Sequence, residues 1–372
     1  MPLGPRDTTN LVMLTGWDAD KLAQFTLQDG TDFATLVAQI NAALQAINAE
    51  LYNDPLWSSL ISYTDQPDVE YRVGASNGMG RFTEYGRADT QRADTEGHML
   101  PLIAWDRMLG WTWNYLRQAR LSQVQADIAD ALKDVRDRWR VQALTRLLKR
   151  SDDSGEANGL GSTGYSPGFA TAAANTNVDY TPPAHAGNTF TSDHEHYVAI
   201  AGGAFTNAVF SDAKEELREH GHEPAFEFLI GKSDEDTVKG LGNFTPVASN
   251  LVAYGANQDL ATLNPVSANG SYYIGTISDF AVRVVPGIPQ YYGFGYKSYG
   301  ANSQRNPLKV RLQKGQLRPQ VIAMPDPRSG GGGAYPLQNV MLFTEFGVGV
   351  KDRTNGTARY VNNSSWTDGT PA

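Results

Sequence analysis

Residues 122–150 read SQVQADIADALKDVRDRWRVQALTRLLKR, and this stretch decides the fold. Its apolar residues recur at steps of three and four positions, which predicts a helix with one buried face. The members of this apolar stripe are Val124, Ile128, Leu132, Val135, Trp139, Ala143 and Leu147. Ser122 and Gln125 have the spacing of a capping box at the first turn. Such a helix would be about 43 Å long, the length of a whole domain.

Charge along this helix follows the helix dipole. Acidic residues dominate its first half, and basic residues close it, which stabilises both ends. Asp134 and Arg138 have the spacing of an i,i+4 ion pair on the outer face. Taken alone, the segment could also be an ordinary long core helix of an α+β enzyme. The neighbouring segments therefore have to show which class of protein this helix belongs to.

A polar, lysine-free segment, roughly Tyr71 to Leu100, precedes this helix. Its aromatic and β-branched residues favour extended structure. A two-stranded excursion of this kind is barely stable alone in water. We therefore expect it to lie across a neighbouring subunit, in a protein whose function is assembly. The predicted assembly contacts are its arginines and acids: Arg72, Arg81, Glu84, Arg87, Asp89, Arg92, Asp94 and Glu96.

Composition bounds the class of protein. The 372 residues can form two or three domains, and 41% hydrophobic and 10% aromatic content are typical of a globular protein. The absence of cysteine excludes disulfides, thiolate metal sites and a cysteine nucleophile. No apolar run approaches the roughly 20 residues of a membrane span, and the first residues, MPLGPRDTTN, do not resemble a signal peptide. A soluble, unexported chain with no membrane partner is expected.

The net charge is −9. Proteins that grip nucleic acid usually carry a basic patch, because neutralising phosphates dominates the affinity. Here basic residues are interleaved with acidic ones. Sequence-specific DNA binding is therefore not expected, although an acidic wall around DNA packaged by another machine is compatible with this charge.

The segments before and after the long helix differ in pattern. Residues 1–31 read as an arm, and residues 32–51 as a second helix with Asp32 as N-cap. The apolar face of that helix comprises Phe33, Leu36, Ile40, Leu44, Ile47 and Leu51. Cover by a neighbouring subunit and packing on the long helix are both open. Residues 151–188 are rich in Gly, Ser, Asn and Pro and are predicted to form a long surface loop.

A mixed α+β region follows. Ser192 with Glu195 predicts one helix start, and Asp212 with Glu215 predicts another helix that ends at Gly221. Residues 325–334 read as a flexible connector. The alternation in 308–312 predicts a strand with one wet face. The predicted strands are 225–230, 272–277, 280–285, 308–312, 320–324, 340–350 and 358–361.

This order of elements resembles the major capsid protein of tailed bacteriophages, the Hong Kong 97 type fold, over most of residues 30–366. Four stretches have the texture of that family. They are MLPLIAWDRMLGWTWNYLRQARLSQVQADIADALKDVRDRW at 99–139, AKEELREHGHEPAFEFLIG at 213–231, DFAVRVVPGIPQYYGFGY at 279–296 and FGVGVKDRTNGTARYVNNSSW at 346–366. The resemblance implies an α+β chain with an N-terminal arm, an extended β E-loop, a P-domain built on a long spine helix, and an α+β A-domain.

The domain bounds follow from the same resemblance. The arm with its amphipathic helix would span 1–70, the E-loop 71–104, and the P-domain 105–190 with its spine helix at 122–150. The A-domain would span 191–334, and strands in 335–372 would return to the P-domain.

The resemblance also implies function and partners. The chain would be a structural subunit of a virion, assembling in the host cytoplasm into pentamers and hexamers that enclose double-stranded DNA. A portal protein and a decoration protein would be further partners. Some members of the family cross-link an E-loop lysine to an asparagine of a neighbour, but this sequence has no lysine between Lys21 and Lys133. We expect non-covalent contacts instead. The 31 residues before the first helix are short for a scaffolding segment, so a separate scaffolding protein is expected.

Other chemical interpretations depend on the histidines. His194/His196 and His220/His222 form two His-x-His pairs that could contribute imidazole ligands to zinc. In a helix the first pair would diverge by about 200°, so we predict no metal, no cofactor and no catalytic residue. The stretch Trp111, Trp113 and Tyr115 is predicted to alternate on one strand face against the long helix. Two alternatives stay open: an encapsulin-like nanocompartment shell, and a metal-dependent hydrolase that uses the His-x-His pairs.

Overall fold

The computed structural model describes residues 26–73, 94–156, 163–177, 180–247, 270–325 and 337–372. The chain divides into two compact units. Unit 1 comprises residues 1–53, 103–139 and 318–346, and unit 2 comprises residues 54–102, 140–317 and 347–372. The predicted connector 325–334 lies outside the described residues except for its first position.

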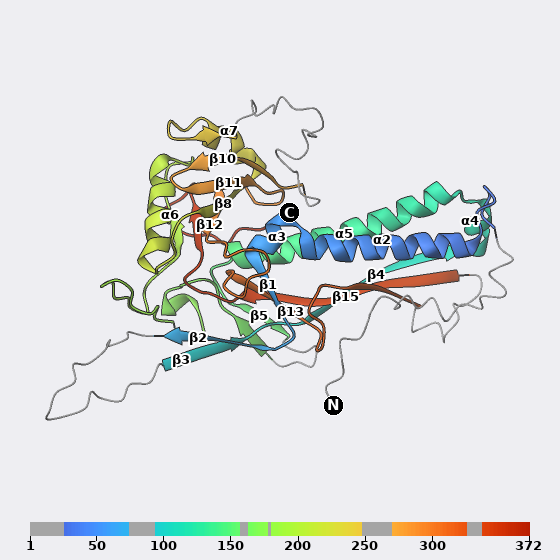
Figure 1. Cartoon of the computed structure of the whole chain (residues 1–372), viewed down its shortest axis with the longest axis horizontal. Helices are drawn as coiled ribbons and strands as arrows, with labels where there is room; N and C mark the ends of the chain where they lie inside the picture. Colours follow the sequence, from blue (N-terminus) through green and yellow to red (C-terminus); the bar gives the residue numbers. More distant parts are fainter. Residues whose placement is uncertain (1–25, 74–93, 157–162, 178–179, 248–269, 326–336) are drawn as a thin grey trace. The chain divides into compact units, whose positions relative to one another are not determined.

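Unit 1 contains the helix predicted at 32–51, which is observed as α2, Phe33–Asn53. Its N-cap is confirmed, because the carboxylate of Asp32 accepts a hydrogen bond of 2.6 Å from the Thr35 amide. The predicted apolar face is buried at Leu36, Ile40, Leu44, Ile47 and Leu51. Figure 1 shows α2 alongside α5, Leu121–Leu148, and the Arg136 guanidinium of α5 makes two hydrogen bonds to Glu50 of α2. The apolar face of α2 is therefore covered within its own unit.

The long helix α5 is confirmed, and its predicted stripe is buried except at half-buried Val135. The predicted capping box at Ser122 is wrong. The helix begins one residue earlier, because the Gln123 side chain accepts from the Arg120 amide (2.9 Å) and Asp29 accepts from the Leu121 amide (2.9 Å). A contact with a distant segment has set the start of the helix.

The predicted Asp134–Arg138 pair is also wrong. Asp134 instead lies 3.3 Å from Arg107, and the Arg138 guanidinium lies 4.4 Å from the centroid of the Trp105 ring. Both partners belong to strand β4, Ile103–Thr112, which draws the two helix side chains toward the sheet. An exposed i,i+4 pair contributes only a few tenths of a kcal/mol, about 0.2–0.5, so tertiary partners readily replace it.

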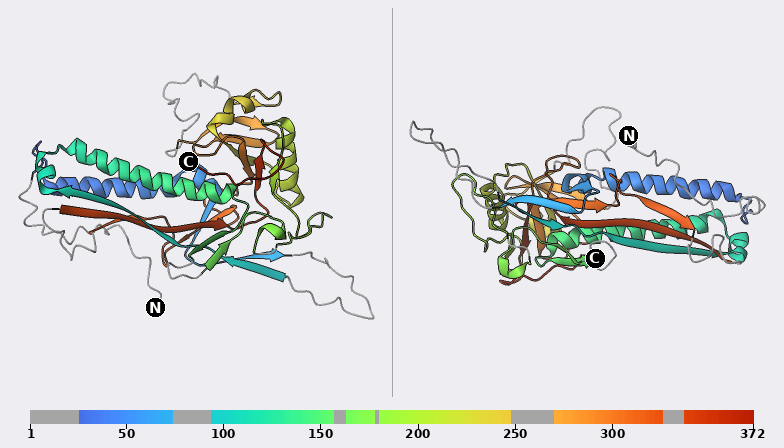
Figure 2. Two further views of the ribbon diagram at one scale, coloured as in Figure 1. Left: turned by 180° about the vertical axis from the view of Figure 1, so that it is seen from behind. Right: turned by 90° about the horizontal axis from the view of Figure 1, so that it is seen from below.

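Three antiparallel strands of a larger sheet complete unit 1. Strand β15, Leu337–Val350, pairs with β4 over residues 337–346 and with β14, Val321–Pro325. Figure 2 shows β4 and β15 running together below the two helices. The amide of Asn48 in α2 donates to the Val321 carbonyl (3.2 Å), and its side-chain oxygen accepts from the Val321 amide (2.7 Å). These bonds fix α2 on β14.

The strand predicted through the tryptophans ends earlier than expected. Thr112 accepts a hydrogen bond from the Tyr115 amide (3.1 Å) and caps a short helix, α4, Trp113–Gln118. Trp113 and Tyr115 therefore lie on a helical turn and not on a strand. The predicted contact with the long helix is confirmed for two of the three residues, since Trp111 (2.9 Å) and Tyr115 (3.2 Å) both donate to Asp127 of α5.

Unit 2 is built around a seven-stranded sheet in the order β7-β16-β12-β8-β11-β10-β9. Its strands are β7 Tyr197–Ala199, β8 Phe226–Ile230, β9 Thr245–Pro246, β10 Tyr272–Ile277, β11 Phe280–Val284, β12 Tyr292–Tyr296 and β16 Thr357–Tyr360. Helix α6, Asn207–Glu219, packs its apolar face on this sheet through Phe210, close to Phe228 and Phe280. Gly293 is required in β12, because a Cβ there would lie 2.5 Å from the Phe228 ring.

Of the two predicted ends of α6, one is confirmed and the other is wrong. Its end at Gly221 is confirmed: Gly221 has φ +83°, and the amides of Gly221 (2.9 Å) and His222 (3.2 Å) donate to the carbonyls of Arg218 and Leu217. Its start at Asp212 is wrong, because α6 begins at Asn207 and so buries Phe210 on the sheet.

The helix predicted after Ser192 is wrong as well. Residues 197–199 form strand β7, which pairs in parallel with β16. Glu195 is not a capping residue there, since its carboxylate accepts from the Ala172 amide at 3.3 Å. Pairing with the sheet overrides the local helix signal at this position.

The prediction that residues 151–188 form a long surface loop is wrong in part. It contains a hairpin of β5, Asp153–Glu156, and β6, Thr163–Ser166. Beyond that hairpin Phe169, Ala170 and Thr171 are fully buried. The segment therefore contributes buried side chains to the core of unit 2.

Strand β13, Leu308–Leu312, was predicted with its correct bounds and pairs in parallel with β1, Ile61–Thr64. The prediction of a wet face is wrong, since Arg311 is only 8% exposed and donates to the Leu100 carbonyl at 2.9 Å.

The remaining helices of unit 2 are short: α3 Pro55–Leu60, η2 Ala173–Asn175, η3 Lys232–Asp234 and α7 Glu235–Lys239. None of the helices described is long and apolar enough to cross a membrane.

Candidate assembly site

The predicted assembly contacts belong to a hairpin of β2, Asp68–Val73, and β3, Asp94–Met99. Within the described part of the chain the two strands pair only with each other, with Tyr71 opposite Glu96 and Arg72 opposite Thr95. The strands carry Arg72, Asp94 and Glu96. The other five predicted contacts, Arg81, Glu84, Arg87, Asp89 and Arg92, lie outside the described residues. All eight remain predictions as contacts between subunits.

One buried arginine anchors the base of this hairpin. Arg353, in the turn between β15 and β16, is fully buried. Its guanidinium donates to the Gly168 carbonyl (3.1 Å), the Thr171 hydroxyl (3.2 Å) and the Tyr71 hydroxyl (3.3 Å). It also lies 4.4 Å from the centroid of the Tyr180 ring. The cation thus joins a strand of the hairpin to the body of unit 2.

Aromatic rings pack around this cation. Tyr71 meets Tyr180 edge-on with ring centroids 5.2 Å apart, and its ring lies 5.7 Å from that of His98. Burial raises the pKa of both tyrosine hydroxyls, so both stay protonated. Burial, and then the charges of Arg353 and Arg146, lower the pKa of His98 to about 3. At the base of the hairpin, neutral rings therefore pack close to the permanent positive charge of Arg353, and the charge of Arg146 also acts on His98.

The polar turn at 352–356, which carries this arginine, is largely buried. Asp352 accepts from the Thr354 amide (3.1 Å) and hydroxyl (2.7 Å), which is the expected turn chemistry. Yet Arg353 and Asn355 are both fully buried, and Asn355 exchanges hydrogen bonds with the backbone of Lys297. A polar turn usually lies at the surface, so nothing in its composition signals this role.

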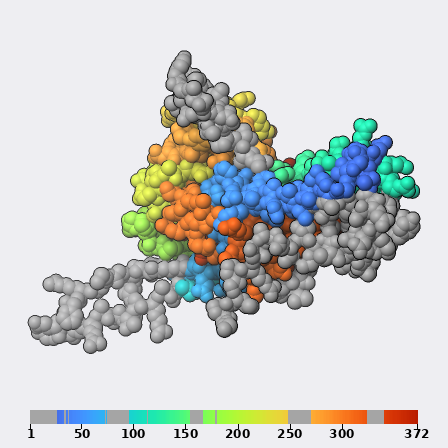
Figure 3. All heavy atoms as spheres, turned by 45° about the vertical axis from the view of Figure 1, so that its right-hand side comes forward, coloured from blue at the N-terminus to red at the C-terminus, as the bar shows by residue number. Residues whose placement is uncertain are grey.

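A second candidate contact surface is the outer face of α2. This face is exposed and carries alanines: Ala38, Ala42, Ala46 and Ala49. Glu50 is the only charged residue in the whole helix, whereas 19% of the chain is charged. Figure 3 shows α2 in blue, open on the visible face of the molecule. An uncharged helix face of this kind suits burial against another protein surface better than water.

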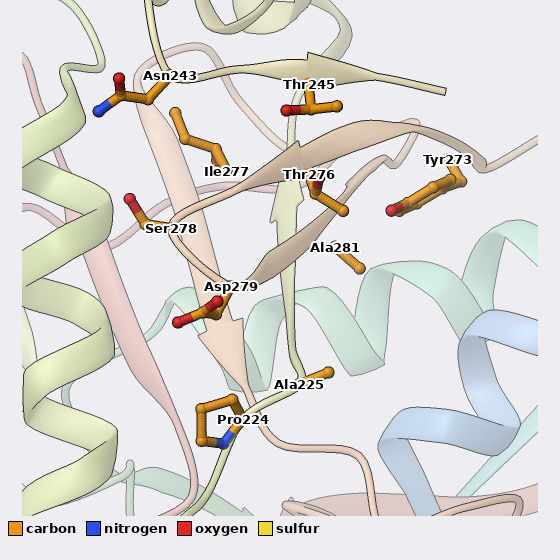
Figure 4. Close-up of a pocket in the computed structure, with 10 residues that line it drawn as sticks. All are labelled: Pro224, Ala225, Asn243, Thr245, Tyr273, Thr276, Ile277, Ser278, Asp279 and Ala281. Atoms are coloured by element: carbon orange, nitrogen blue, oxygen red, sulfur yellow. The ribbon is translucent and has the colours of Figure 1, made fainter. Parts of the chain in front are cut away.

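A hollow of about 460 Å³ lies at the turn between β10 and β11. Figure 4 shows its lining residues, among which Asn243, Thr245, Thr276 and Ser278 are polar but uncharged. The carboxylate of Asp279 lies 3.1 Å from the Lys214 ammonium group, which neutralises it. This lining provides neither a nucleophile with a base nor a set of metal ligands, so the hollow has no catalytic arrangement of its own.

The structure corrects the geometry assumed for the histidine pairs. His194 and His196 are not on a helix, and their Nε2 atoms lie 2.9 Å apart instead of diverging. His220 joins them at 2.9 Å from each. His222 does not, because its two ring nitrogens contact the hydroxyls of Tyr299 (2.8 Å) and Thr354 (3.1 Å). Three of the four candidate histidines therefore come together across the two pairs.

Comparison with known proteins bears on the fold. No protein-family model matches the sequence. No curated protein matches it either. Among solved structures, a chain from Mycobacterium phage Patience is 19% identical, with 94% of each chain covered and a TM-score of 0.60.

Two further solved structures are less similar to this chain. The mature capsid of bacteriophage PhiM1 is 10% identical, covers 84% of this chain and 88% of its own, and has a TM-score of 0.48. The SrpI encapsulin of Synechococcus elongatus PCC 7942 is 12% identical, covers 84% and 89%, and has a TM-score of 0.44. The fold of this chain is that of the phage major capsid proteins, as the sequence resemblance predicted.

Proposed function

We propose that the protein is the structural subunit of an icosahedral viral capsid and is not an enzyme. The observation that carries this proposal is the fold, matched over nearly the whole length of this chain and of the phage Patience chain. In this role the chain acts as a plate that associates with copies of itself into pentamers and hexamers. Its location is the virion, after assembly in the host cytoplasm.

The elements of the chain divide naturally between the parts of such a subunit. We assign residues 1–70 to the arm, 71–104 to the E-loop, 105–190 to the P-domain with α5 as its spine, 191–334 to the A-domain, and 335–372 to strands that return to the P-domain. The β2–β3 hairpin fits the E-loop assignment, because a hairpin that pairs with none of the other described strands requires external support. Arg353 holds the base of the hairpin, and residues of the E-loop would contact a neighbouring subunit.

Contacts between subunits are non-covalent in this proposal. The E-loop segment has no lysine, so it lacks the nucleophile for an isopeptide bond to asparagine. Arginines and acids of the loop would pair across subunit boundaries instead. One exposed pair contributes only about 0–1 kcal/mol, but a closed shell multiplies each contact through multivalency. The uncharged outer face of α2 adds a second surface for such contacts.

Partners follow from the same role. With a net charge of −9 the shell would enclose double-stranded DNA without reading its sequence. A separate scaffolding protein, a portal protein and a decoration protein would complete the particle.

Negative-stain electron microscopy of the chain, expressed alone and with its genomic neighbours, tests the proposal. Closed angular shells, sheets or capsomer rings are expected. Nuclease-protected DNA in the particles would distinguish a capsid from a nanocompartment, which would hold cargo protein instead. A monodisperse monomer or dimer in every condition would contradict the capsid role.

A further inference from the structure

Three imidazoles and one carboxylate converge in unit 2. His194 and His196 precede β7, while Glu219 and His220 lie at the end of α6. The three Nε2 atoms form a triangle with sides of 2.9 Å. One oxygen of Glu219 lies 3.3 Å from Nε2 of His194 and 3.6 Å from Nε2 of His220. Four potential ligand atoms therefore face one point from two segments of the chain.

Hydrogen bonding among the rings cannot account for this triangle. In a neutral imidazole each nitrogen is either a donor or an acceptor. Because three Nε2 atoms share only two states, at least one of the three contacts must join two donors or two acceptors. For His196 the state is defined, since its Nδ1 donates to the Gly356 carbonyl at 2.7 Å, which leaves Nε2 with its lone pair. Protonating a ring adds another donor and does not resolve the conflict.

We propose that His194, His196, His220 and Glu219 bind one divalent transition-metal ion, with zinc as the best fit. A cation lets all three Nε2 atoms act as acceptors at once. An ion placed just off the plane of a 2.9 Å triangle can lie about 2.0–2.1 Å from every corner, the Zn–N distance of protein sites. Glu219 supplies the fourth ligand on the open side. The donor set of imidazole nitrogens and one carboxylate suits zinc and excludes magnesium or calcium, which prefer oxygen.

The surroundings favour a structural ion and not a catalytic one. His196 is fully buried, and the side chain of His220 is 1% exposed. The Phe190 ring packs 4.7 Å from His194 and 4.3 Å from His220, centroid to centroid. Four protein ligands would fill a four-coordinate site, whereas catalytic zinc keeps one position open for water or substrate. The hydrogen bond from His196 to Gly356 is the outer contact that orients a ligating imidazole.

The ion would stabilise the edge of the seven-stranded sheet. Strand β7 is the last strand on its side, and its lead-in segment carries two of the ligands. The other two end α6, which packs on the same sheet. One ion would thus tie an edge strand to the helix that covers it. This inference does not depend on the capsid role, because all four ligands belong to one chain.

Metal content of the full-length, untagged protein tests the proposal. Protein treated with EDTA and dialysed is titrated with Zn²⁺ or Co²⁺ and measured by inductively coupled plasma mass spectrometry. We expect one ion per chain, the intense visible absorption of tetrahedral Co²⁺, and a higher Tm in the presence of Zn²⁺. Less than half an equivalent of bound metal after reconstitution, with Tm unchanged, would overturn the site whether or not the chain forms particles.

Two variants assign the ligands. Glu219→Gln alters a side chain that is 32% exposed, so the chain should fold, and we expect Zn²⁺ affinity to fall by about tenfold or more. His194→Gln should lower it further and change the Co²⁺ spectrum. The matched control is His185→Gln, an exposed histidine close to Gly221 that is outside the ligand set. Equal zinc affinity in Glu219→Gln, His194→Gln and the control would refute the assignment.

Discussion

Arg353 and Tyr71 lie 282 positions apart in the chain, yet the guanidinium of Arg353 donates a hydrogen bond to the Tyr71 hydroxyl at 3.3 Å. The same guanidinium bonds Gly168 and Thr171. A turn near the end of the sequence therefore holds a hairpin formed near its beginning. Three predictions concern the contacts of this hairpin and its support, and a fourth concerns the outer face of α2.

Replacing Arg353 with Met should destabilise unit 2 and loosen the hairpin. The substitution leaves the Gly168 carbonyl and the Thr171 hydroxyl without their donor, and we expect a loss of about 2–4 kcal/mol in the free energy of unfolding. Tyr71→Phe removes one hydrogen bond and should cost about 1 kcal/mol. Chemical denaturation gives both values, and hydrogen exchange should rise in β2 and β3. Equal stability of Arg353→Met and wild type would show that the cation is not the anchor.

Stability should fall in mild acid because of His98. Its pKa is about 3 in the folded protein and about 6.5 when unfolded. Since the unfolded chain takes the proton first, this contribution is complete above pH 6.5 and is lost as the pH falls toward 3. Relative to His98→Phe, the wild type should lose about 2 kcal/mol between pH 6.5 and pH 5.

Urea unfolding at several pH values measures this difference. His185→Gln is the control, because it removes an exposed histidine and leaves His98 in place. A constant difference between wild type and His98→Phe would mean that His98 does not titrate during unfolding.

Charge on the outer face of α2 should block assembly without unfolding the chain. Ala42→Glu places a carboxylate on the uncharged exposed face, and we expect the yield of particles to fall by about tenfold or more because each closed shell repeats the defect. Ala129→Glu is the matched control, since Ala129 is exposed on α5 next to Asp130, on a face that is already charged.

Both alanine variants should unfold within about 0.5 kcal/mol of wild type. Sedimentation and electron microscopy give the particle yields. Normal particles from Ala42→Glu would exclude this face from the contacts between subunits.

Mature particles should separate into single chains on a denaturing gel. The segment between Lys21 and Lys133 has no lysine, so it lacks the nucleophile for an isopeptide bond to an asparagine of a neighbour. Boiled particles are expected to give one monomer band. A ladder of covalent oligomers would contradict the non-covalent arrangement, and mass spectrometry of the ladder would locate the bond.

The sequence by itself determined the elements whose patterns are local and repeated. Apolar periodicity predicted α2 and α5, because a helix in a globular protein must bury one face whatever it packs against. Gly221 ended α6 as predicted, since a positive φ favours glycine within a few residues of a helix end. The bounds of β10 and β13 were also correct. The order of these elements was enough to indicate the phage capsid fold.

Tertiary structure alone decided the features that join distant segments. Arg311 is buried, although alternation in 308–312 predicted a wet face, and Arg353 is buried within a polar turn. The segment at 192–199 has a helix signal but pairs with β16 instead. That extended path brings His194 and His196 to His220 and Glu219, where a helix would have turned them apart. Sequence spacing describes neighbours along the chain, whereas these contacts depend on which strands and helices meet in space.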